Sequence, residues 1–465
     1  MEADRIAAQI VLERRSRQGE CFDLWRQYVN PAWADLLQST GWGRRFVHAA
    51  GLELEDERGR HYLDFLSGFG VLGLGHNHPA VRDALRAVLD EHLPGFTQVE
   101  CTTLAGLAAE RLAKLLPGDL RRVFFCSSGS EAVEAALKLA RAATGRKRFV
   151  ACTGAYHGST LGVLGLMGIE AARDRFRPLL PGVDHIPYGD LKALGKTLRW
   201  GDVAAFVVEP ILGEGGAVVP DPCFLTEARR LTRAHGALLI VDEVQTGLGR
   251  TGRMFAFQHS PDVVPDAVTV AKVLGGGLVP VGAMVARSEP FDRAFGSADR
   301  CMDHAATFGG GPLAMAAVLA TLQVIEDEGL VERAAQRGVR LRRRLDELRE
   351  KHSAIREVRG LGLMLGLKFA DAAHGWLDNT PLAGLGKASA TLFVQYVALR
   401  LLDEHGILTQ AAVNDGGVLK VMPPLTVTDE AIDRFAEALD VVLSDAGHVA
   451  AVARFAKEWA ASRKL

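Results

Sequence analysis

Residues 236–286 read GALLIVDEVQTGLGRTGRMFAFQHSPDVVPDAVTVAKVLGGGLVPVGAMVA. Two apolar runs in this stretch, ALLIV and VTVA, are each followed by a charged residue, Asp242 and Lys272. Continuous apolar runs of this kind are typical of strands that are buried on both faces of a parallel sheet. Because open α/β sheets bind their ligands at the carboxyl ends of their strands, we expect Asp242 and Lys272 at the ligand-binding edge.

The chain around this stretch alternates between strands and helices. Strand-like runs occupy residues 122–127, 148–153, 204–210, 237–244, 267–274 and 281–286, and helical runs lie between most of them. Such alternation predicts an α/β fold, in which a mostly parallel sheet is covered by helices on both faces. We assign this large domain to residues 96–335.

Both ends of the chain have an α+β pattern instead. Residues 1–95 are expected to form an N-terminal arm and part of a smaller domain, and residues 336–465 to supply the rest of that domain. One long helix, straight or bent, is predicted over residues 311–353. The polar segment 371–387, which is rich in Gly and Pro, is predicted to be a surface loop.

The composition is that of an ordinary globular protein. With 48% hydrophobic residues, 24% charged residues and a net charge of -2, the chain has no general attraction for nucleic acid or an anionic membrane. The six cysteines are scattered without a CxxC pair, so neither a disulfide framework nor a metal site is indicated. Residues 1–20 are too charged for a signal peptide, and no apolar run reaches the roughly 18 residues of a membrane span. We therefore expect a cytoplasmic enzyme.

A strand, a glycine turn and a helix follow one another in FFCSSGSEAVEAALKLAR, residues 124–141. Ser128 and Glu131 form a capping pattern at the start of the helix. Free amides at a helix N-terminus, with a glycine that admits a ligand and with flanking hydroxyls, make a phosphate cradle. Ser128, Gly129 and Ser130 are therefore candidate phosphate ligands, although a plain capped helix explains the same pattern without any ligand.

Two further strand ends carry candidate site residues. ACTGAYHGST (151–160) places Tyr156 and His157 on a loop, where an aromatic ring can stack on a flat ligand. VVEPILGEGG (207–216) places Glu209 at a strand end and Glu214 in a glycine-rich loop. Each of these residues also has a plain explanation, because such side chains are common on solvated loops.

Asp242 and Lys272 are the sharpest signals. An acid at the end of a buried run needs a partner, and a protonated pyridine nitrogen would be one. A lysine in a dry place has a lowered pKa, which suits Schiff-base formation and proton transfer. The alternative is a structural ion pair between the two residues.

Two other motifs resemble binding sites but lack the required context. GLGRTG (247–252) has the spacing of a dinucleotide fingerprint, yet DEVQT separates it from its strand, and Pro261 and Pro265 prevent a long helix after it. His76 and His78 in GHNHP suggest a metal pair, but no further ligands accompany them.

Taken together, these motifs resemble the class III, pyridoxal-phosphate-dependent aminotransferases of fold type I. The resemblance covers roughly residues 40–445 and is most specific in LLIVDEVQTGLGRTGRMFAFQH and PDAVTVAKVLGGGLVPVGAM. It implies a large domain with a seven-stranded sheet, a small domain built from both chain ends, and a homodimer whose active sites lie at the subunit interface.

The resemblance also assigns roles to particular residues. Lys272 would form the Schiff base with pyridoxal phosphate, and Asp242 would hold its pyridine nitrogen. Ser128, Gly129 and Ser130 would bind the phosphate. The ring would lie between Tyr156, beside His157, and Val244. Gln245 would lie near the ring hydroxyl, supported by Glu209. Thr307, in HAATFGGGPLA, would reach the phosphate of the partner subunit's cofactor, although Gly311 departs from the Asn common in the family.

The substrate is less constrained by the motifs. Where family members often place a carboxylate-binding arginine before Pro-Pro, this chain has Lys420 in VLKVMPPL, and Glu214 matches the acid that balances it. A lysine lacks the bidentate fork of arginine, so tight α-carboxylate binding is not expected. Phe69, in SGFG, is a candidate pocket wall, with core packing as the alternative.

The N-terminal half looks most like the putrescine branch of the family. The expected reaction is a ping-pong transfer of an amino group between a diamine, another terminal amine or the matching aldehyde and a 2-oxo acid. An ω-amino acid or ornithine-like substrate remains an alternative. So do a lyase, racemase or aminomutase reaction on the same scaffold, and a cofactor-binding regulatory protein without turnover.

Overall fold

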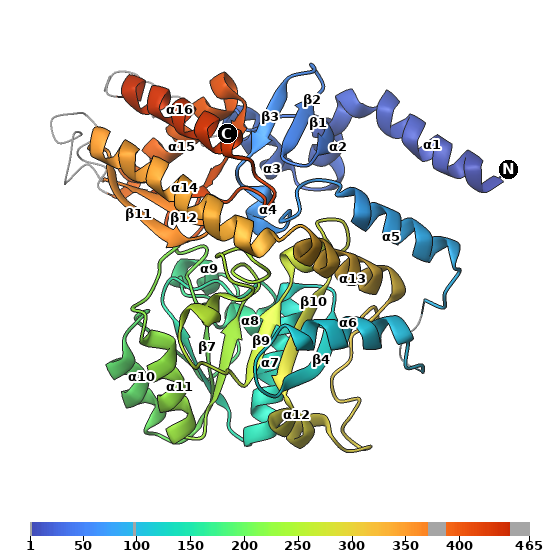
Figure 1. Cartoon of the computed structure of the whole chain (residues 1–465), viewed down its shortest axis with the longest axis vertical. Helices are drawn as coiled ribbons and strands as arrows, with labels where there is room; N and C mark the ends of the chain where they lie inside the picture. Colours follow the sequence, from blue (N-terminus) through green and yellow to red (C-terminus); the bar gives the residue numbers. More distant parts are fainter. Residues whose placement is uncertain (1, 96–98, 371–386, 447–465) are drawn as a thin grey trace.

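The computed structural model describes residues 2–95, 99–370 and 387–446 (Figure 1). Its centre is one sheet with the strand order β4-β10-β9-β8-β7-β5-β6. The strands are β4 (Leu120–Cys126), β5 (Arg148–Cys152), β6 (Val183–Ile186), β7 (Val203–Val208), β8 (Leu238–Asp242), β9 (Ala267–Val270) and β10 (Gly282–Arg287). Strand β10 pairs antiparallel with β4 and β9, and the other pairs are parallel. The predicted seven-stranded, mostly parallel sheet is therefore confirmed.

Both faces of this sheet are buried. In β8, Leu239 and Val241 belong to the hydrophobic cluster on one face, and Ile240 belongs to the cluster on the other. Helices α7 (Gly129–Thr144) and α12 (Ser288–Phe295) cover the face of Ile240. The opposite face is covered by α6 (Thr103–Lys114), α10 (Leu191–Leu198), α11 (Phe224–Ala234) and α13 (Pro312–Asp327). This burial explains why the strand sequences are continuously apolar; every residue of β7 is buried.

Two smaller sheets combine the two ends of the chain. The first has the order β1-β2-β3-β13, with β1 (Phe46–Ala50), β2 (Glu53–Asp56), β3 (His61–Asp64) and β13 (Ile407–Leu408). The second has the order β11-β12-β15-β14, with β11 (Ile355–Leu361), β12 (Met364–Phe369), β14 (Gln410–Ala411) and β15 (Val418–Val421). Strands β3 and β13 are parallel partners, so an early and a late segment share one sheet. Residues 1–95, 96–335 and 336–465 remain our proposed domain limits.

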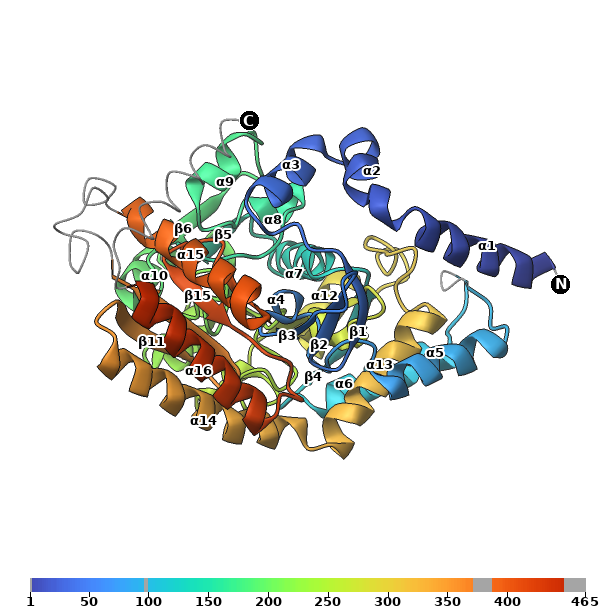
Figure 2. The same ribbon diagram turned by 90° about the horizontal axis from the view of Figure 1, so that it is seen from above.

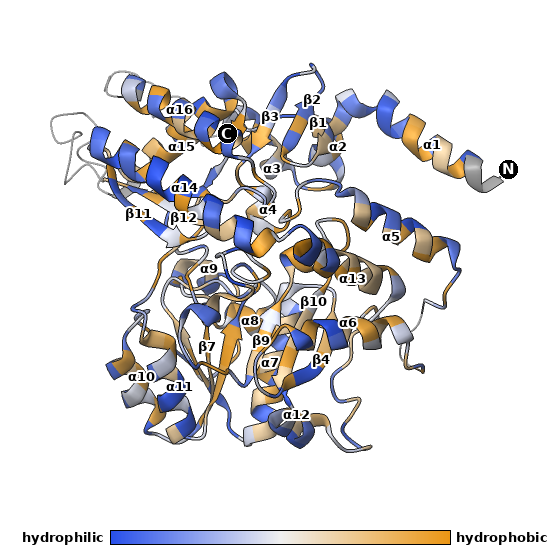
Figure 3. Ribbon diagram, in the orientation of Figure 1, coloured by the Kyte–Doolittle hydropathy of each residue, from blue (hydrophilic) through white to orange (hydrophobic). Residues whose placement is uncertain are grey.

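Helices α14 (Leu330–Lys351), α15 (Lys387–His405) and α16 (Asp429–Ala446) pack with these smaller sheets. The hydropathy colouring shows hydrophilic and hydrophobic residues alternating along α14, whereas the central strand β7 is hydrophobic (Figure 3). The buried residues of α14 recur every three or four positions, which is the spacing of one helical face.

The predicted long helix over residues 311–353 is two helices. Helix α13 ends at Asp327 and α14 begins at Leu330. Gly329 between them has a φ of +58°, a left-handed conformation that a glycine adopts without strain and that breaks the helix. Strand β6 is the other departure from the six predicted strands, because VDHI is short and half polar. The predicted surface loop at 371–387 lies outside the described residues except for Lys387, where α15 begins.

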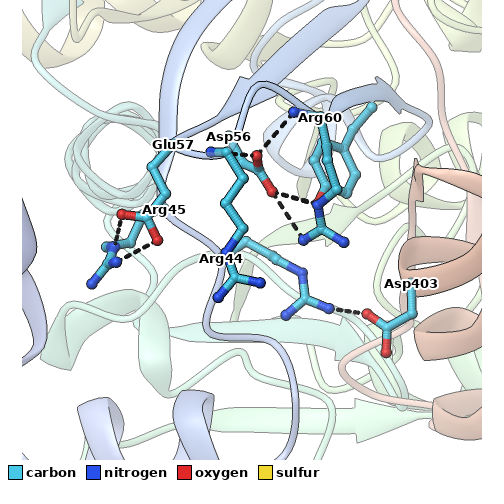
Figure 4. A network of polar contacts seen from close by, with 8 residues as sticks. Arg44, Arg45, Asp56, Glu57, Arg60 and Asp403 are labelled. Atoms are coloured by element: carbon cyan, nitrogen blue, oxygen red, sulfur yellow. Dashed lines mark hydrogen bonds and ion pairs between the residues drawn. The ribbon is translucent and has the colours of Figure 1, made fainter.

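The N-terminal arm consists of α1 (Glu2–Ser16), a 3-10 turn (Gln18–Glu20), α2 (Cys21–Tyr28) and α3 (Pro31–Ser39). Helix α1 extends away from the rest of the molecule in both views (Figures 1 and 2). Ion pairs fasten the segment after α3 (Figure 4). Arg44 donates to Asp403 of α15, and Arg45 donates to Glu57 at the end of β2. Within β2 and the following turn, Asp56 accepts from Arg60.

The remaining short elements lie around the large sheet and between the domains. They are α4 (Ser67–Gly70), α5 (Pro79–Asp90), α8 (Leu161–Leu164), α9 (Glu170–Asp174) and the 3-10 turns η2 (Ala256–His259) and η3 (Lys272–Gly275). None of the helices in the described residues is both long and apolar enough to span a membrane.

Candidate active site

A cavity of about 470 Å³ lies at the carboxyl ends of the central strands. Eleven of the predicted site residues line it: Ser128, Gly129, Ser130, Tyr156, His157, Glu209, Glu214, Asp242, Val244, Gln245 and Lys272. Apolar residues complete the wall, among them Val71, Leu278 and Val279. Predicted residues Phe69, Lys420 and Thr307 do not line the cavity. The fold thus brings together segments from 71 to 281 at the edge where an α/β sheet binds its ligands.

The N-terminus of α7 forms one end of the cavity. The Ser128 hydroxyl accepts a hydrogen bond from the Glu131 amide (3.2 Å), and the Glu131 carboxylate accepts one from the Ser127 amide (2.6 Å). Helix geometry leaves the first amides, those of Gly129 and Ser130, without an intrahelical acceptor. A Cβ atom at position 129 would lie 2.9 Å from Cγ1 of Val244, so glycine keeps this end open. The cradle has the donors that an anion needs.

Asp242 ends β8 and is 3% exposed. It accepts hydrogen bonds from the Thr269 hydroxyl (3.1 Å) and the Val244 amide (3.0 Å), and its other oxygen lies 2.7 Å from Nδ1 of His157. Lys272 is not among its hydrogen-bond or ion-pair partners in the described part of the chain. The structural ion pair between Asp242 and Lys272, which the sequence left open, therefore does not form.

His157 lies behind Asp242 and is fully enclosed. Burial disfavours its protonation, but the hydrogen bond and the charge of Asp242 outweigh burial and raise the pKa of His157 above its ordinary value. Its other ring nitrogen, Nε2, is buried and has no hydrogen-bond partner among the described residues. A positively charged imidazole at this place would favour the ionised carboxylate of Asp242.

Lys272 follows β9 directly and opens the turn η3. Its φ of +48° is left-handed, which is rare for a residue with a side chain and is typically retained at functional sites. Burial, followed by the nearby charge of Lys420, lowers the pKa of Lys272 to about 8. At neutral to mildly basic pH the amine is therefore uncharged far more often than an exposed lysine. This is the state in which an amine attacks an aldehyde.

Glu209 connects two loops beneath the cavity. Its carboxylate accepts hydrogen bonds from the amides of Tyr156 and Gly213, each at 2.9 Å. Burial raises the pKa of Glu209 to about 7. The expectation that Glu209 supports Gln245 needs correction, because Gln245 is held by other partners and Glu209 instead fixes the backbone that carries Tyr156.

Those partners form a buried polar cluster beside the cavity. Gln245 Nε2 donates to Glu214 Oε1 (2.9 Å) and to the Phe69 carbonyl (3.0 Å). Lys420 on β15 donates to the same Glu214 oxygen (2.5 Å), and its Nζ lies 5.1 Å from the centre of the Phe69 ring. Lys420 is only 2% exposed. Burial disfavours charge on Glu214, but the Lys420 and Lys272 cations outweigh it and hold the pKa of Glu214 below its ordinary value.

Phe69 belongs to an unusual turn. Ser67, Gly68, Phe69 and Gly70 have φ values of 51°, 56°, 59° and 92°, so four successive residues are left-handed. For residues with a side chain this conformation costs about 1–2 kcal/mol each, and Ser67 and Phe69 are both of that kind. Asp64 offsets part of the cost by accepting hydrogen bonds from the Leu66 and Ser67 amides.

Thr307 lies apart from the cavity. It is exposed, on the segment between α12 and α13. Its expected contact is with the partner subunit's cofactor, which this single chain does not test.

The two motifs without context have other partners. His76 Nε2 lies 3.0 Å from Asp64, and His78 Nε2 lies 3.1 Å from Glu328, so each histidine has its own carboxylate. No group of three or more metal-binding side chains occurs among the described residues. GLGRTG continues through turns into η2 and not into a long helix.

Sequence reasoning missed three residues of the site: Thr269, which donates to Asp242, and the pair of Asp64 and His76. A hydroxyl inside the buried run AVTV needs a partner, and that signal could have identified Thr269. Asp64 and His76 had no local signal, because they meet only when β3 and the following loop are folded.

Comparisons with known proteins agree with this geometry. Residues 42–443 match the family model for class III aminotransferases. Aminotransferase PigE of Serratia sp. (strain ATCC 39006) is 35% identical over 456 residues, which are 92% of this chain and 53% of that protein. The chain thus spans about half the length of this relative.

Solved structures of aminotransferases share the fold. The ornithine aminotransferase of Toxoplasma gondii is 32% identical with a TM-score of 0.76, covering 86% of this chain and 90% of that one. An (S)-enantioselective omega-transaminase of Thermomicrobium roseum is 30% identical with a TM-score of 0.78, covering 86% and 92%. Fold and site define a pyridoxal-phosphate-dependent aminotransferase. Within that class, the chain belongs to the class III aminotransferase family.

The residues present fit pyridoxal phosphate. The N-terminus of α7 offers amides and hydroxyls for the phosphate, Asp242 is a buried acid for the pyridine nitrogen, and Lys272 is an amine with a lowered pKa. When bound, the cofactor acts as an electron sink for negative charge on the carbon next to the amine. The putrescine branch is not confirmed, since the similar proteins named here include ornithine and omega-transaminases.

Proposed function

We propose that this enzyme moves an amino group between a primary amine and a 2-oxo acid by a ping-pong mechanism. The amine is a diamine, another terminal amine or, in the reverse direction, the matching aldehyde. The observation that carries the proposal is the contact of Lys420 with Glu214 at 2.5 Å. It neutralises the one cation at the place where the family often binds an α-carboxylate.

The surroundings of that pair support the same substrate class. Lys420 is buried, lacks the fork of an arginine and faces the Phe69 ring, so an incoming carboxylate would have to displace Glu214 to reach it. The cavity wall nearby is apolar, with Val71, Leu278 and Val279. A neutral or cationic chain is therefore accommodated better than an α-carboxylate.

The remaining roles follow from position. We assign Schiff-base formation to the amine of Lys272, and then transfer of a proton between the substrate carbon and the cofactor by the same nitrogen once a substrate amine has displaced it. Asp242, with His157 behind it, would keep the pyridine nitrogen protonated. Ser128, Gly129 and Ser130 would fix the phosphate, and Tyr156 and Val244 would enclose the ring.

We also propose a homodimer and a cytoplasmic location. The support for the dimer is Thr307, which is exposed and lies outside the cavity of its own chain, as expected of a residue that serves the partner's cofactor. All six cysteines are free, which fits a reducing compartment. Analytical ultracentrifugation of the purified protein tests the dimer.

A donor panel tests the reaction. Putrescine, longer diamines, monoamines, ornithine and β-alanine are each offered with pyruvate or 2-oxoglutarate, and the absorbance of the bound cofactor is followed. We expect its band to disappear with a terminal amine and to return with the 2-oxo acid. Preference for ornithine or β-alanine would replace the diamine proposal by the ω-amino acid alternative.

Other outcomes identify the remaining alternatives. Product formation from a single substrate without these half-reactions would indicate a lyase, racemase or aminomutase. A band that no amine changes would indicate a cofactor-binding protein without turnover.

A further inference from the structure

We propose that Asp64 and His76 are positioning residues, which hold the left-handed turn Ser67–Gly70 and, through it, the orientation of Gln245 in the cavity. Neither residue lines the cavity, and the sequence offers no motif that assigns them this task. The proposal rests on the function proposed above for the cavity.

Asp64 is the anchor of the turn. One carboxylate oxygen accepts hydrogen bonds from the Leu66 amide (2.9 Å) and the Ser67 amide (2.7 Å), and the other lies 3.0 Å from Nε2 of His76. The Asp64 side chain is 2% exposed. A buried carboxylate needs every partner it has, so removal of His76 leaves one oxygen without its donor.

The far side of the turn contacts the cavity wall. The Phe69 carbonyl accepts from Nε2 of Gln245, and the same nitrogen donates to Glu214. A Cβ atom on Gly70 would lie 3.1 Å from Met422 and 3.7 Å from Gln245, so the turn is closely packed there. A shift of the turn would therefore move the amide of Gln245, which lines the cavity.

His76 can be changed without moving its backbone. Its amide donates to the Gly51 carbonyl (2.7 Å), and its carbonyl accepts from the Gly51 amide (2.9 Å). The ring is thus attached to a fixed point and contributes mainly its contact with Asp64. The left-handed φ values of Ser67 and Phe69 make the turn dependent on such contacts, because a relaxed backbone would leave this conformation.

His78 is a matched control in the same segment. Its Nε2 lies 3.1 Å from the carboxylate of Glu328, and its side chain is 15% exposed, compared with 16% for His76. The two histidines therefore share chemistry, exposure and neighbourhood in sequence. They differ in that only the carboxylate beside His76 caps the turn.

The test compares His76→Ala, His76→Gln and His78→Ala in the full-length holoenzyme. Hydrogen exchange followed by mass spectrometry is measured on the peptide that contains Leu66 and Ser67. We expect exchange of these amides to become about tenfold faster in His76→Ala, to return toward the wild-type rate in His76→Gln, which keeps a donor, and to stay unchanged in His78→Ala.

Steady-state kinetics with the best amine of the donor panel give the second readout. His76→Ala is expected to raise KM about fivefold with kcat changed less than about twofold, whereas His78→Ala leaves both unchanged. Equal behaviour of the two alanine variants would overturn the proposal. Faster exchange with unchanged KM would also overturn it, since the turn would then not position the site.

Failure of the proposed function is distinguishable from failure of this inference. If wild-type protein converts no amine, the reaction assignment is wrong, while the exchange measurement and the affinity of the cofactor-free protein for pyridoxal phosphate still decide the role of His76. A His76→Ala variant that binds the cofactor as tightly as His78→Ala and exchanges at the same rate contradicts the inference in that case as well.

Discussion

The two sides of the cavity are built in different ways. On the cofactor side, Ser128, Asp242 and Lys272 each follow a strand of one sheet directly, so their places are set by short local segments. On the substrate side, Phe69, Glu214 and Lys420 come from three distant parts of the chain and meet through hydrogen bonds and ring contacts. Chemistry that the family shares therefore rests on the sheet, whereas substrate choice rests on contacts between the domains.

The largest expected effect is on the cofactor side. Lys272→Ala removes the amine that forms the Schiff base and carries the proton, so transamination should fall by a factor on the order of 10³ or more, while pyridoxal phosphate still binds without a covalent bond. Turnover and the absorbance of the bound cofactor are measured together. Lys138→Ala serves as control, because Lys138 contacts Asp303 and His304 outside the cavity. Substantial residual turnover in Lys272→Ala would remove Lys272 from its assigned role.

On the substrate side, Lys420→Arg should change preference more than rate. An arginine can hold Glu214 and still offer a second donor to a carboxylate, so activity with ornithine relative to a diamine should rise about tenfold. The specificity ratio is measured as kcat/KM for each donor. Lys368→Arg is the matched control, since Lys368 pairs with Asp415 (2.6 Å) away from the cavity. An unchanged ratio would mean that this pair does not select the substrate.

A third experiment joins the two sides through charge. The uncharged amine of Lys272 is the reactive form, so capture of pyridoxal phosphate by cofactor-free protein should accelerate as the pH rises and level off with a midpoint near 8, where burial and Lys420 place the pKa of Lys272. Lys420→Met removes a neighbouring cation and leaves the acid Glu214, and both changes should move the midpoint upward. Stopped-flow absorbance measures the rate, and a midpoint that does not move would separate the two sides electrostatically.

The same contrast decides how much was predictable. Periodicity alone indicated the α/β sheet, because strands buried on both faces are continuously apolar, and charges after such strands identified Asp242 and Lys272. It did not indicate β6, which is short and half polar, or the break at Gly329. The resemblance to the family supplied Glu214 and Lys420.

The pairing of Asp64 with His76 shows where local reasoning ends. GHNHP looked like a weak metal motif because its histidines have no visible partner in sequence. Their partners, Asp64 and Glu328, lie 12 and 250 positions away and become neighbours only in the fold. Residues that act on a backbone turn, and not on a ligand, leave no pattern of spacing from which their role can be inferred.

The smallest expected effect tests how closely the cofactor side is packed. In Gly129→Ala, the new Cβ atom would lie 2.9 Å from Cγ1 and 3.2 Å from Cγ2 of Val244, so Val244 must move, and cofactor affinity should fall about three- to tenfold. Gly106→Ala on α6, where nothing lies within 4 Å of a new Cβ atom, should leave affinity unchanged. The double variant Gly129→Ala/Val244→Ala separates causes, because it relieves the contact and should recover part of the affinity if crowding is responsible. If affinity falls further, then Val244 contacts the ring itself, and the two residues contribute independently to cofactor binding.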